Sequence, residues 1–418
     1  MNHNCMAETT KFSRGYYVFL IVFLGMLSAF GPFVTDMYLP TLPSMAEIFS
    51  TTPSLVQMGL ATSMLGLAVG QIFFGPLSDK YGRRRILLAA MVLFAVSTVV
   101  SIYSPTIEFF NVCRFVQGLG GAGGIVLSRS ISTDCYSGRE LAKTMAIIGA
   151  VNGIAPVTAP VIGGLVSEAV GWQGIFWILF ALGVLLIGMC MAFCESLPRE
   201  RRHKGSIASL MLAFPGLLRQ KYFLVYVLMF AFANGVLFAY ISSAAFIIQN
   251  HFGFSELIFA VIFGINALGI GIGSALSLKF KRMSSAAIFG AAGISVMAIL
   301  QLICNSLSGR FIVFEILMFL ILIFTGYIFT AATTLAMDEG RDHIGAASAI
   351  FGATGFLFGG IVSPLVGIGD FMTTTLTIIA ICSLSSLVFA LISYKRKSAA
   401  PEAAGPADAE NTGNQRQS

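Results

Sequence analysis

Long apolar runs alternate with short polar connections along nearly the whole chain. Each run holds the roughly 20 residues that an α-helix needs to cross the hydrocarbon core of a bilayer. None shows the sustained period-two alternation of a membrane barrel strand, which needs only about 10 residues. The pattern therefore predicts an all-α polytopic membrane protein with 12 transmembrane helices. The runs lie at about 16–38, 55–77, 86–104, 107–130, 144–166, 174–194, 223–248, 257–279, 286–305, 311–336, 346–367 and 374–394.

The composition narrows the class of protein further. Hydrophobic residues make up 56% of the 418 positions and charged residues only 11%, whereas soluble domains are about 25% charged. This composition excludes a soluble enzyme, a disordered chain and a secreted disulfide scaffold. The lipid bilayer is therefore the first expected partner.

The basic residues fall mainly on one side of the predicted spans. They precede the first run, and they occupy the connections after the second, fourth, sixth, eighth and tenth runs and the segment after the twelfth. Because cytoplasmic loops carry an excess of Lys and Arg, both termini are expected in the cytoplasm. The net charge of +6 has the same explanation, and no basic stretch carries the interleaved aromatics of a nucleic-acid site. The first run is too long for a cleaved signal peptide, so we expect it to remain as a helix.

The longest internal connection divides the spans into six and six. Within it, residues 206–218 are too few to cross, and we expect them to lie along the inner surface as an amphipathic segment. The polar tail is expected to be disordered. The predicted organisation is a cytoplasmic segment at 1–15, a six-helix bundle at 16–194, a cytoplasmic loop at 195–222, a second six-helix bundle at 223–397 and a cytoplasmic tail at 398–418.

The two halves resemble each other weakly. The basic end of the connection after the second run has a counterpart after the eighth, and the fifth and eleventh runs both hold several Gly and Pro residues. Pseudo-symmetric six-helix halves are typical of transporters whose halves rock about a site near the membrane midplane.

The connection between the second and third runs reads Gly-Pro-Leu-Ser-Asp-Lys-Tyr-Gly-Arg-Arg-Arg, starting at Gly75. Its glycines suit a tight turn between antiparallel helices. Asp79 can pair with the neighbouring cations or face the positive end of a helix. Such contacts can form and break as two bundles move. The alternative is that the cations only hold the loop inside.

Two ionisable residues lie inside apolar runs of the first half. Arg114 stands about eight residues into the fourth run, next to Gln117 and a group of glycines that permit close helix packing. Asp36 lies in the outer half of the first run and, by depth, within reach of Arg114. A charge at that depth is costly unless it faces a partner or a wet cavity, so we expect the two side chains to meet and exchange a proton. The alternatives are a structural ion pair for Arg114 and a helix cap near the outer surface for Asp36.

The fifth run contains Gly153, Pro156, Pro160 and Gly164. Proline bends a helix because it removes a backbone hydrogen bond, and glycine lets helices approach closely. The alternative is an ordinary kinked membrane helix.

Together these segments resemble the major facilitator superfamily and, within it, the Bcr/CflA branch of bacterial bicyclomycin and chloramphenicol resistance exporters. The stretch from Gly75 is similar to the superfamily's loop signature between helices two and three. Arg-Phe-Val-Gln-Gly at Arg114 is similar to the R-x-x-Q-G motif of helix four. The stretch from Gly153 is similar to the fifth-helix motif of drug/proton antiporters, from which it departs at Ala155, where glycine is usual.

The resemblance implies a fold of two pseudo-symmetric six-helix bundles. It implies that a monomer in a bacterial inner membrane exports drug-like small molecules in exchange for protons by alternating access. Asp36 and Arg114 would couple transport to protons. The substrate would contact Tyr38, Gln117, Asn234, Tyr240 and Asn266. Conformational change would use Gly75, Asp79, Gly82, Arg83, Gly153, Pro156, Pro160 and Gly164, the first four as a latch between the halves. The alternative is proton-coupled uptake or exchange of a small metabolite on the same fold.

Other classes of membrane protein fit less well. No histidine lies within a run, and the 7 cysteines form no CxxC pair, so we expect no metal site, no cofactor and no membrane-embedded enzyme. No repeat resembles a channel filter. Glu315 is the other acidic residue inside a run, near the outer end of the tenth; we expect its carboxylate to extend to the membrane surface, and a role within the bundle is the alternative.

Overall fold

A computed structural model describes residues 14–205, 213–307, 309–341 and 344–399. All regular structure in these ranges is helical. Of the predicted amphipathic segment, residues 206–212 lie outside the described residues, and the rest falls largely in the helix α9 (Ala213–Arg219). The predicted tail lies outside them beyond Ala399, where the last helix ends.

The first half contains the first six apolar runs. One long helix, α7, is interrupted at Gly171, whose φ of 72° and ψ of −175° are not helical, so it consists of two arms that carry the fifth and sixth runs. The elements are α1 (Arg14–Ser28), α2 (Phe30–Asp36), η1 (Leu39–Thr41), α3 (Leu42–Ile48), α4 (Pro53–Tyr81), α5 (Arg83–Ile102), α6 (Ile107–Cys135) and α7 (Gly138–Ala192).

The second half contains the remaining six runs and follows the short elements η2 (Arg199–Arg201) and α9. Its helices are α10 (Lys221–Ala245), the π-helical turn η3 (Phe246–His251), α11 (Glu256–Ser277), α12 (Met283–Leu307), α13 (Phe311–Glu339), α14 (Ile344–Leu365) and α15 (Phe371–Ala399).

Ten helical segments of the described chain are long and apolar enough to cross a membrane. The helix α6 is not among them although it has 29 residues, because Asn111, Arg114 and Gln117 lower its hydropathy. The fifth run is not a separate segment because it is continuous with the sixth in α7. The predicted runs thus fall within helices, and the number of 12 spans stays a prediction.

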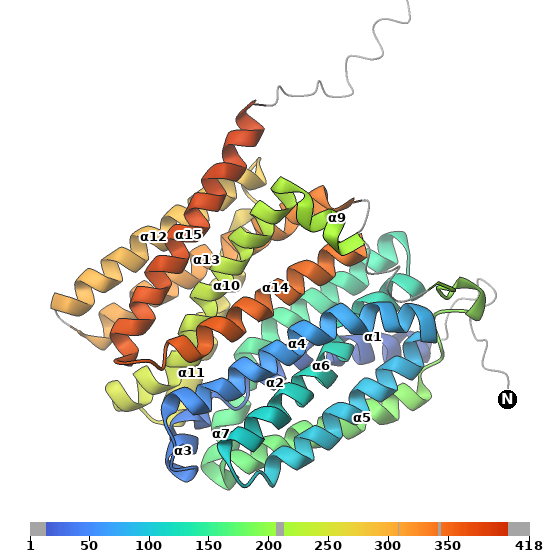
Figure 1. The fold of residues 1–418 in the computed structure, drawn as a ribbon, viewed down its shortest axis with the longest axis horizontal. Coiled ribbons are helices and arrows are strands. Elements are labelled where there is room, and N and C mark those ends of the chain that lie inside the picture. The colour runs from blue at the N-terminus through green and yellow to red at the C-terminus, as the bar shows by residue number, and fades with distance from the viewer. Residues whose placement is uncertain (1–13, 206–212, 308, 342–343, 400–418) are drawn as a thin grey trace, which may run out of the picture.

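The helices run back and forth between two ends of the molecule (Figure 1). We call one the terminal end, where α1 begins, α9 lies and α15 finishes. We call the other the distal end, where α3, η3 and the break in α7 lie. Asp36 and Glu315 both lie in the distal part of their helical segments, and the turn between α4 and α5 lies at the terminal end.

Among the crossings of the described helices that bring backbones into direct contact, two stand at matching places, one in each half. The helices α4 and α6 cross at Gly66 and Gly118, where a Cβ on either residue would overlap a backbone carbonyl of the other helix. The helices α11 and α13 cross at Gly273 and Gly326 in the same way. Close crossings of this kind are typical of small residues in membrane helices. Their matching places show the predicted pseudo-symmetry of the halves in three dimensions.

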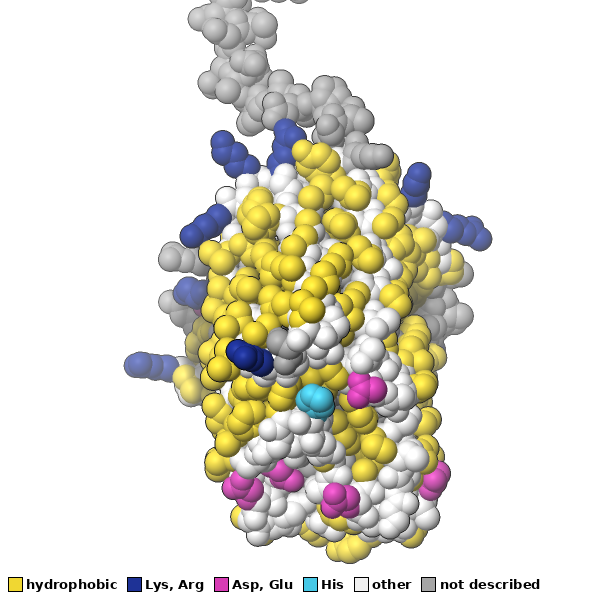
Figure 2. Space-filling model, turned by 90° about the vertical axis from the view of Figure 1, so that its left-hand side faces the viewer, with side chains coloured by type: hydrophobic (Ala, Val, Ile, Leu, Met, Phe, Trp, Pro, Cys, Tyr) yellow, Lys and Arg dark blue, Asp and Glu magenta, His cyan; other side chains and the backbone are white. Residues whose placement is uncertain are grey.

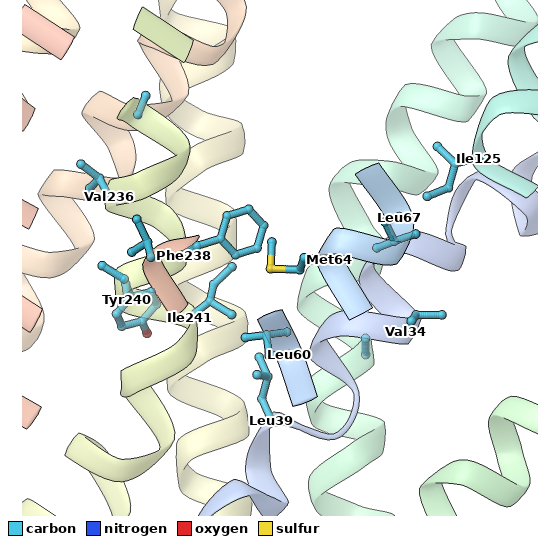
Figure 3. Close-up of a cluster of buried hydrophobic side chains, with 14 of the residues drawn as sticks. Val34, Leu39, Leu60, Met64, Leu67, Ile125, Val236, Phe238, Tyr240 and Ile241 are labelled. Carbon is cyan, nitrogen blue, oxygen red and sulfur yellow. The ribbon is translucent and has the colours of Figure 1, made fainter. Parts of the chain in front are cut away.

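The halves meet along two pairs of helices, α4 with α14 and the first arm of α7 with α11. Figure 3 shows Met64 of α4 and Phe238 of α10 pointing toward one another between the halves. Both side chains also border Gly359 of α14, at which a Cβ would clash with them. The centre of the molecule is therefore lined with apolar and aromatic groups from both halves.

The outer surface is apolar over a broad band. In the face drawn in Figure 2, Lys and Arg gather mainly toward the upper end of the molecule, and Asp and Glu gather mainly toward the lower end. This arrangement suits a protein whose sides face lipid.

Candidate functional site

A cavity of about 280 Å³ lies between the two halves. Its wall comes from α2 and the first arm of α7 on one side and from α10, α11, α13 and α14 on the other. Most of the wall is apolar, with Phe263, Phe329 and Phe356 among its members, and Thr35, Asp36 and Tyr240 bring polar groups to it. An apolar pocket with a few placed polar groups is typical of small-molecule sites.

Asp36 is the last residue of α2, and it is only 4% exposed. Its carboxylate accepts a hydrogen bond from the Thr35 hydroxyl at 2.7 Å. Among the described residues, no Lys, Arg or His forms an ion pair with it. The cavity wall therefore carries a buried carboxyl group whose hydrogen-bond donor is neutral.

Arg114 is fully buried in α6 and pairs with no carboxylate among the described residues. Its guanidinium donates to the Val34 carbonyl at 2.7 Å and to the Gln117 side-chain carbonyl, and it lies 4.3 Å from the ring centroid of Tyr38. Val34 belongs to the last turn of α2, whose carbonyls lack partners inside the helix. A cation at this helix end is also favourable because it opposes the negative end of the helix dipole.

The predicted contact between Asp36 and Arg114 is wrong for this structure. Residues two positions apart on a helix point about 200° apart, because each residue turns the helix by about 100°. The helix α2 packs the Val34 side chain near Gly121 of α6, so Asp36 faces away from α6 and toward the cavity. The acid and the base are joined only indirectly, through the end of α2.

Three predicted substrate contacts lie outside the cavity wall. Gln117 bridges Arg114 and Thr98, with its amide nitrogen 2.7 Å from the Thr98 hydroxyl. Tyr38 covers the guanidinium. Asn234 donates to the Phe230 carbonyl of its own helix at 3.0 Å. As substrate contacts these three residues stay predictions.

The other two predicted contacts come together. Tyr240 lines the cavity, and the amide nitrogen of Asn266 donates to its hydroxyl oxygen at 2.6 Å. The same nitrogen donates to Glu315 Oε1, also at 2.6 Å. The expectation that Glu315 extends to the membrane surface is therefore wrong, because Asn266 offers its carboxylate a donor inside the bundle. The sequence singled out all three residues of this cluster separately, but it did not predict the contacts among them.

The turn between α4 and α5 carries a second cluster, at the terminal end. Gly82 has a φ of 98°, which favours glycine because it has no Cβ. Arg83 pairs with Asp79 at 2.5 Å and with Asp134 at 2.9 Å. Sequence reasoning gave Asp134 no role; it lies four residues beyond the predicted run at 107–130.

The same turn is bound by the start of the connection between the halves. The Glu195 carboxylate accepts the backbone N–H groups of Arg83 at 2.9 Å and Arg84 at 3.3 Å, the first two residues of α5. Sequence reasoning missed Glu195 too. The contacts described for this cluster all lie within the first half and the connection that follows it, so the latch between the halves stays a prediction. Gly75 lies one helical turn before Asp79, in α4.

The predicted fifth-helix motif lies in the first arm of α7, where all four of its residues are found. Pro156 lines the cavity. A Cβ at Gly164 would lie 3.1 Å from the Ala260 Cβ of α11, in the other half. Gly153 and Pro160 stand on the same arm. This arm thus forms both part of the cavity and part of the boundary between the halves.

Hydrogen bonds between the halves gather at the distal end. The Gln57 amide donates to the Ser242 carbonyl at 2.9 Å, and the Gln249 amide donates to the Pro40 carbonyl at 2.8 Å. At the terminal end Arg129 donates to the Ser348 hydroxyl over a longer 3.5 Å. A third bond at the distal end is donated by the Ser167 hydroxyl to the Glu256 carboxylate. These bonds hold the halves together on the distal side of Asp36.

Known proteins resemble this chain in both sequence and fold. The profile of the Major Facilitator Superfamily matches residues 18–364. The chain is 36% identical over 381 residues to the uncharacterized MFS-type transporter YdgK of Bacillus subtilis (strain 168), covering 89% of this chain and 94% of the relative. It is 28% identical over 365 residues to a bicyclomycin resistance protein homolog of Haemophilus influenzae, covering 84% and 89% of the two chains.

The fold is also that of a solved transporter. The xylose transporter XylE from E. coli, in a partially occluded inward open conformation, matches with a TM-score of 0.71 at 15% identity, covering 91% of this chain and 98% of that one. The relatives confirm the prediction of a transporter rather than an enzyme. Sequence and architecture agree, and this chain belongs to the Major Facilitator Superfamily.

Proposed function

We propose that this chain exports drug-like small molecules from the bacterial cytoplasm in exchange for protons. The observation that carries the proposal is Asp36, a buried carboxyl group that forms no ion pair among the described residues and lies on the wall of a largely apolar cavity between the halves. Ionisable groups inside membrane helices are costly, and they mark ion and proton pathways. The resemblance to a bicyclomycin resistance protein homolog supports the substrate class.

Asp36 would exchange its proton with whichever side the cavity faces. Protonation removes a charge from an apolar cavity. A protonated Asp36 therefore favours the occluded state through which the carrier without substrate changes between its two facing states. Arg114, Gln117 and Tyr38 would hold the end of α2 in place around this group. Each proton that moves inward through 100 mV supplies about 2.3 kcal/mol, which can drive a neutral substrate outward.

The distal end would face outward and the terminal end the cytoplasm, because Lys and Arg gather toward the terminal end (Figure 2). The distal hydrogen bonds then close the outer side, which supports an inward-facing state. The halves at 16–194 and 223–397 would move as the two rigid parts of a monomer. The cluster around Arg83 would act as the cytoplasmic latch.

Growth of a pump-deficient bacterial host tests this function. Expression of the chain should raise the inhibitory concentrations of bicyclomycin, chloramphenicol or other neutral apolar drugs. Asp36→Asn should abolish the protection at an unchanged membrane level of the protein. Glu47→Gln, which neutralises an exposed carboxylate of α3, should keep it. Drug sensitivity equal to that of the empty vector across the panel would refute drug export, and full protection by Asp36→Asn would remove Asp36 from the mechanism.

Inside-out vesicles distinguish export from the uptake alternative. In vesicles acidified by respiration, a drug that enters in exchange for protons should make the interior less acidic, as read by a fluorescent pH probe. Protons that move in the same direction as the substrate would instead identify an uptake carrier.

A further inference from the structure

A second, partly buried carboxyl group, that of Glu315, is connected to the cavity through two hydrogen bonds. Asn266 is fully buried, and its amide nitrogen lies 2.6 Å from both the Tyr240 hydroxyl oxygen and Glu315 Oε1. Tyr240 is 1% exposed, lines the cavity and stacks on Phe263, another residue of the wall. The row of contacts thus runs from α13 through α11 to α10 and ends at the central cavity.

The electrostatic surroundings of Glu315 leave its charge unbalanced. Within the described ranges, no Lys, Arg or His forms an ion pair with it. On the helices packed against α13, Tyr240 of α10 reaches it through Asn266, Glu256 of α11 is bonded to Ser167, and α14 carries no charged residue. On α12, Cys304 lines a separate small cavity with Arg310.

Two polar atoms of the row have no hydrogen-bond partner in the described structure. They are Glu315 Oε2 and Asn266 Oδ1, and both are buried. A carboxylate can only accept hydrogen bonds, whereas a carboxylic acid can also donate one. An added proton on Glu315 would therefore give this site a donor, and the idle amide oxygen is an acceptor for it.

Asn266 can serve both protonation states of Glu315. With Glu315 ionised, the amide nitrogen donates to the carboxylate and to the Tyr240 oxygen, as observed. The Tyr240 hydroxyl proton is then free to point into the cavity. With Glu315 protonated, rotation of the amide by 180° brings Oδ1 between the carboxylic acid and the Tyr240 hydroxyl, and both now donate to it. Tyr240 then has no proton to offer to the cavity.

We propose that Glu315 is a second proton-binding carboxyl group, and that its protonation withdraws the Tyr240 hydroxyl donor from the cavity by turning Asn266. A substrate with a carbonyl or other acceptor oxygen binds Tyr240 while Glu315 is ionised, and it loses that bond when Glu315 gains a proton. The proton comes from water that enters the open cavity and forms an O–H bond on Glu315; it returns to water on release. This proposal rests on the proposed proton-coupled export, in which Asp36 takes the first proton.

The stoichiometry of exchange tests it. The purified full-length chain is reconstituted in liposomes with chloramphenicol as a neutral probe that bears carbonyl oxygens, and the membrane potential is clamped at zero. At a pH difference of one unit, exchange of two protons sustains an about 100-fold gradient of the probe and exchange of one proton an about tenfold gradient. Wild type should sustain about 100-fold, and Glu315→Gln about tenfold.

Matched variants separate coupling from folding. Tyr240→Phe keeps the acid but removes the hydroxyl, so it should also give about tenfold. Glu108→Gln neutralises an exposed carboxylate in the first turn of α6 and should keep the wild-type gradient. Counterflow of labelled probe without a pH difference should persist in every variant. This result would show that each variant is folded.

The outcomes are distinct. A Glu315→Gln gradient equal to that of wild type overturns the proposal, as does a wild-type gradient of about tenfold. Complete loss of the gradient in Glu315→Gln with intact counterflow also overturns it, because Glu315 would then be the first proton site. If Glu315→Gln shows no counterflow, the Tyr240→Phe gradient decides. A wild-type chain that builds no gradient at all refutes proton-coupled export itself.

Discussion

Arg114 is a buried charge that is stabilised without an opposite charge. Its guanidinium is fully buried and is stabilised by dipoles, namely the Val34 carbonyl, the Gln117 amide and the ring of Tyr38. A helix end and an aromatic face both favour a nearby cation. The side chain thereby fixes the end of the short helix that carries Asp36.

Replacement of Arg114 should therefore affect stability as well as transport. Arg114→Ala leaves buried acceptors without a donor, and each such loss costs about 1–3 kcal/mol. Arg114→Lys keeps a cation but cannot bond both acceptors with one planar group, so we expect partial transport and an intermediate melting temperature in detergent. Full activity and wild-type melting in both variants would show that the contacts of Arg114 are dispensable.

Individual residues show where sequence reasoning ends. Asp36 and Arg114 could be found because an ionisable residue in an apolar run is costly. Their relative direction could not, since a shift of one residue turns a side chain by about 100°. Glu315 and Asn266 were each noticed as polar residues within apolar runs, but nothing in the sequence joined the two across 49 positions.

At the scale of single elements, the start of α5 depends on a distant residue. Gly82 provides no side-chain cap for this helix, and Glu195 accepts its first two backbone N–H groups instead. A carboxylate at a helix N-terminus satisfies unpaired donors and opposes the positive end of the dipole. The terminal end of α5 is thus held by the residues that follow the sixth span.

Glu195→Ala should lower the stability of the first half. Loss of a side-chain cap costs about 1 kcal/mol, and we expect a lower melting temperature of the purified chain in detergent. Glu200→Ala changes an exposed carboxylate of η2 in the same connection and serves as the control. Equal melting of the two variants would mean that the cap contributes nothing.

The helix crossings give a second test at this scale. A Cβ at Gly273 would overlap the Ile323 carbonyl, whereas the space around a Cβ at Gly271 of the same helix is open. Gly273→Ala should therefore lose about 1–3 kcal/mol through overpacking, and Gly271→Ala should be neutral or slightly stabilising because alanine favours the helix. Thermal unfolding of both proteins in one detergent measures the difference. A Gly273→Ala chain as stable as Gly271→Ala would show that α11 and α13 can separate without cost.

At the scale of the whole molecule, the observed state closes the cavity on its distal side. The bonds from Gln57, Gln249 and Ser167 cross between the halves there. The apolar runs allowed the helices and the two similar halves to be predicted, because each run must satisfy its own backbone within lipid. The state could not be predicted, since one sequence must support both an inward and an outward arrangement.

A reversible cross-link can test the role of the distal closure. Ser167→Cys and Glu256→Cys, combined in a chain without native cysteines, place two thiols where the side chains now share a hydrogen bond. Oxidation should stop transport in vesicles, and reduction should restore it. The transport activity of each single-cysteine variant should be unchanged by the oxidant. Transport at the full rate by the cross-linked protein would mean that the halves need not part at this end.

The dependence of α5 on Glu195 also orders the assembly of the protein during synthesis. The ribosome makes α5 before residue 195, so the first backbone N–H groups of this helix lack the Glu195 acceptor until then. Only when the second arm of α7 has been inserted does the carboxylate arrive to fix that helix. The start of α5 is therefore stabilised only after the last residues of the first half have been made. A chain truncated just before Glu195 should be cleaved by proteases at the turn between α4 and α5.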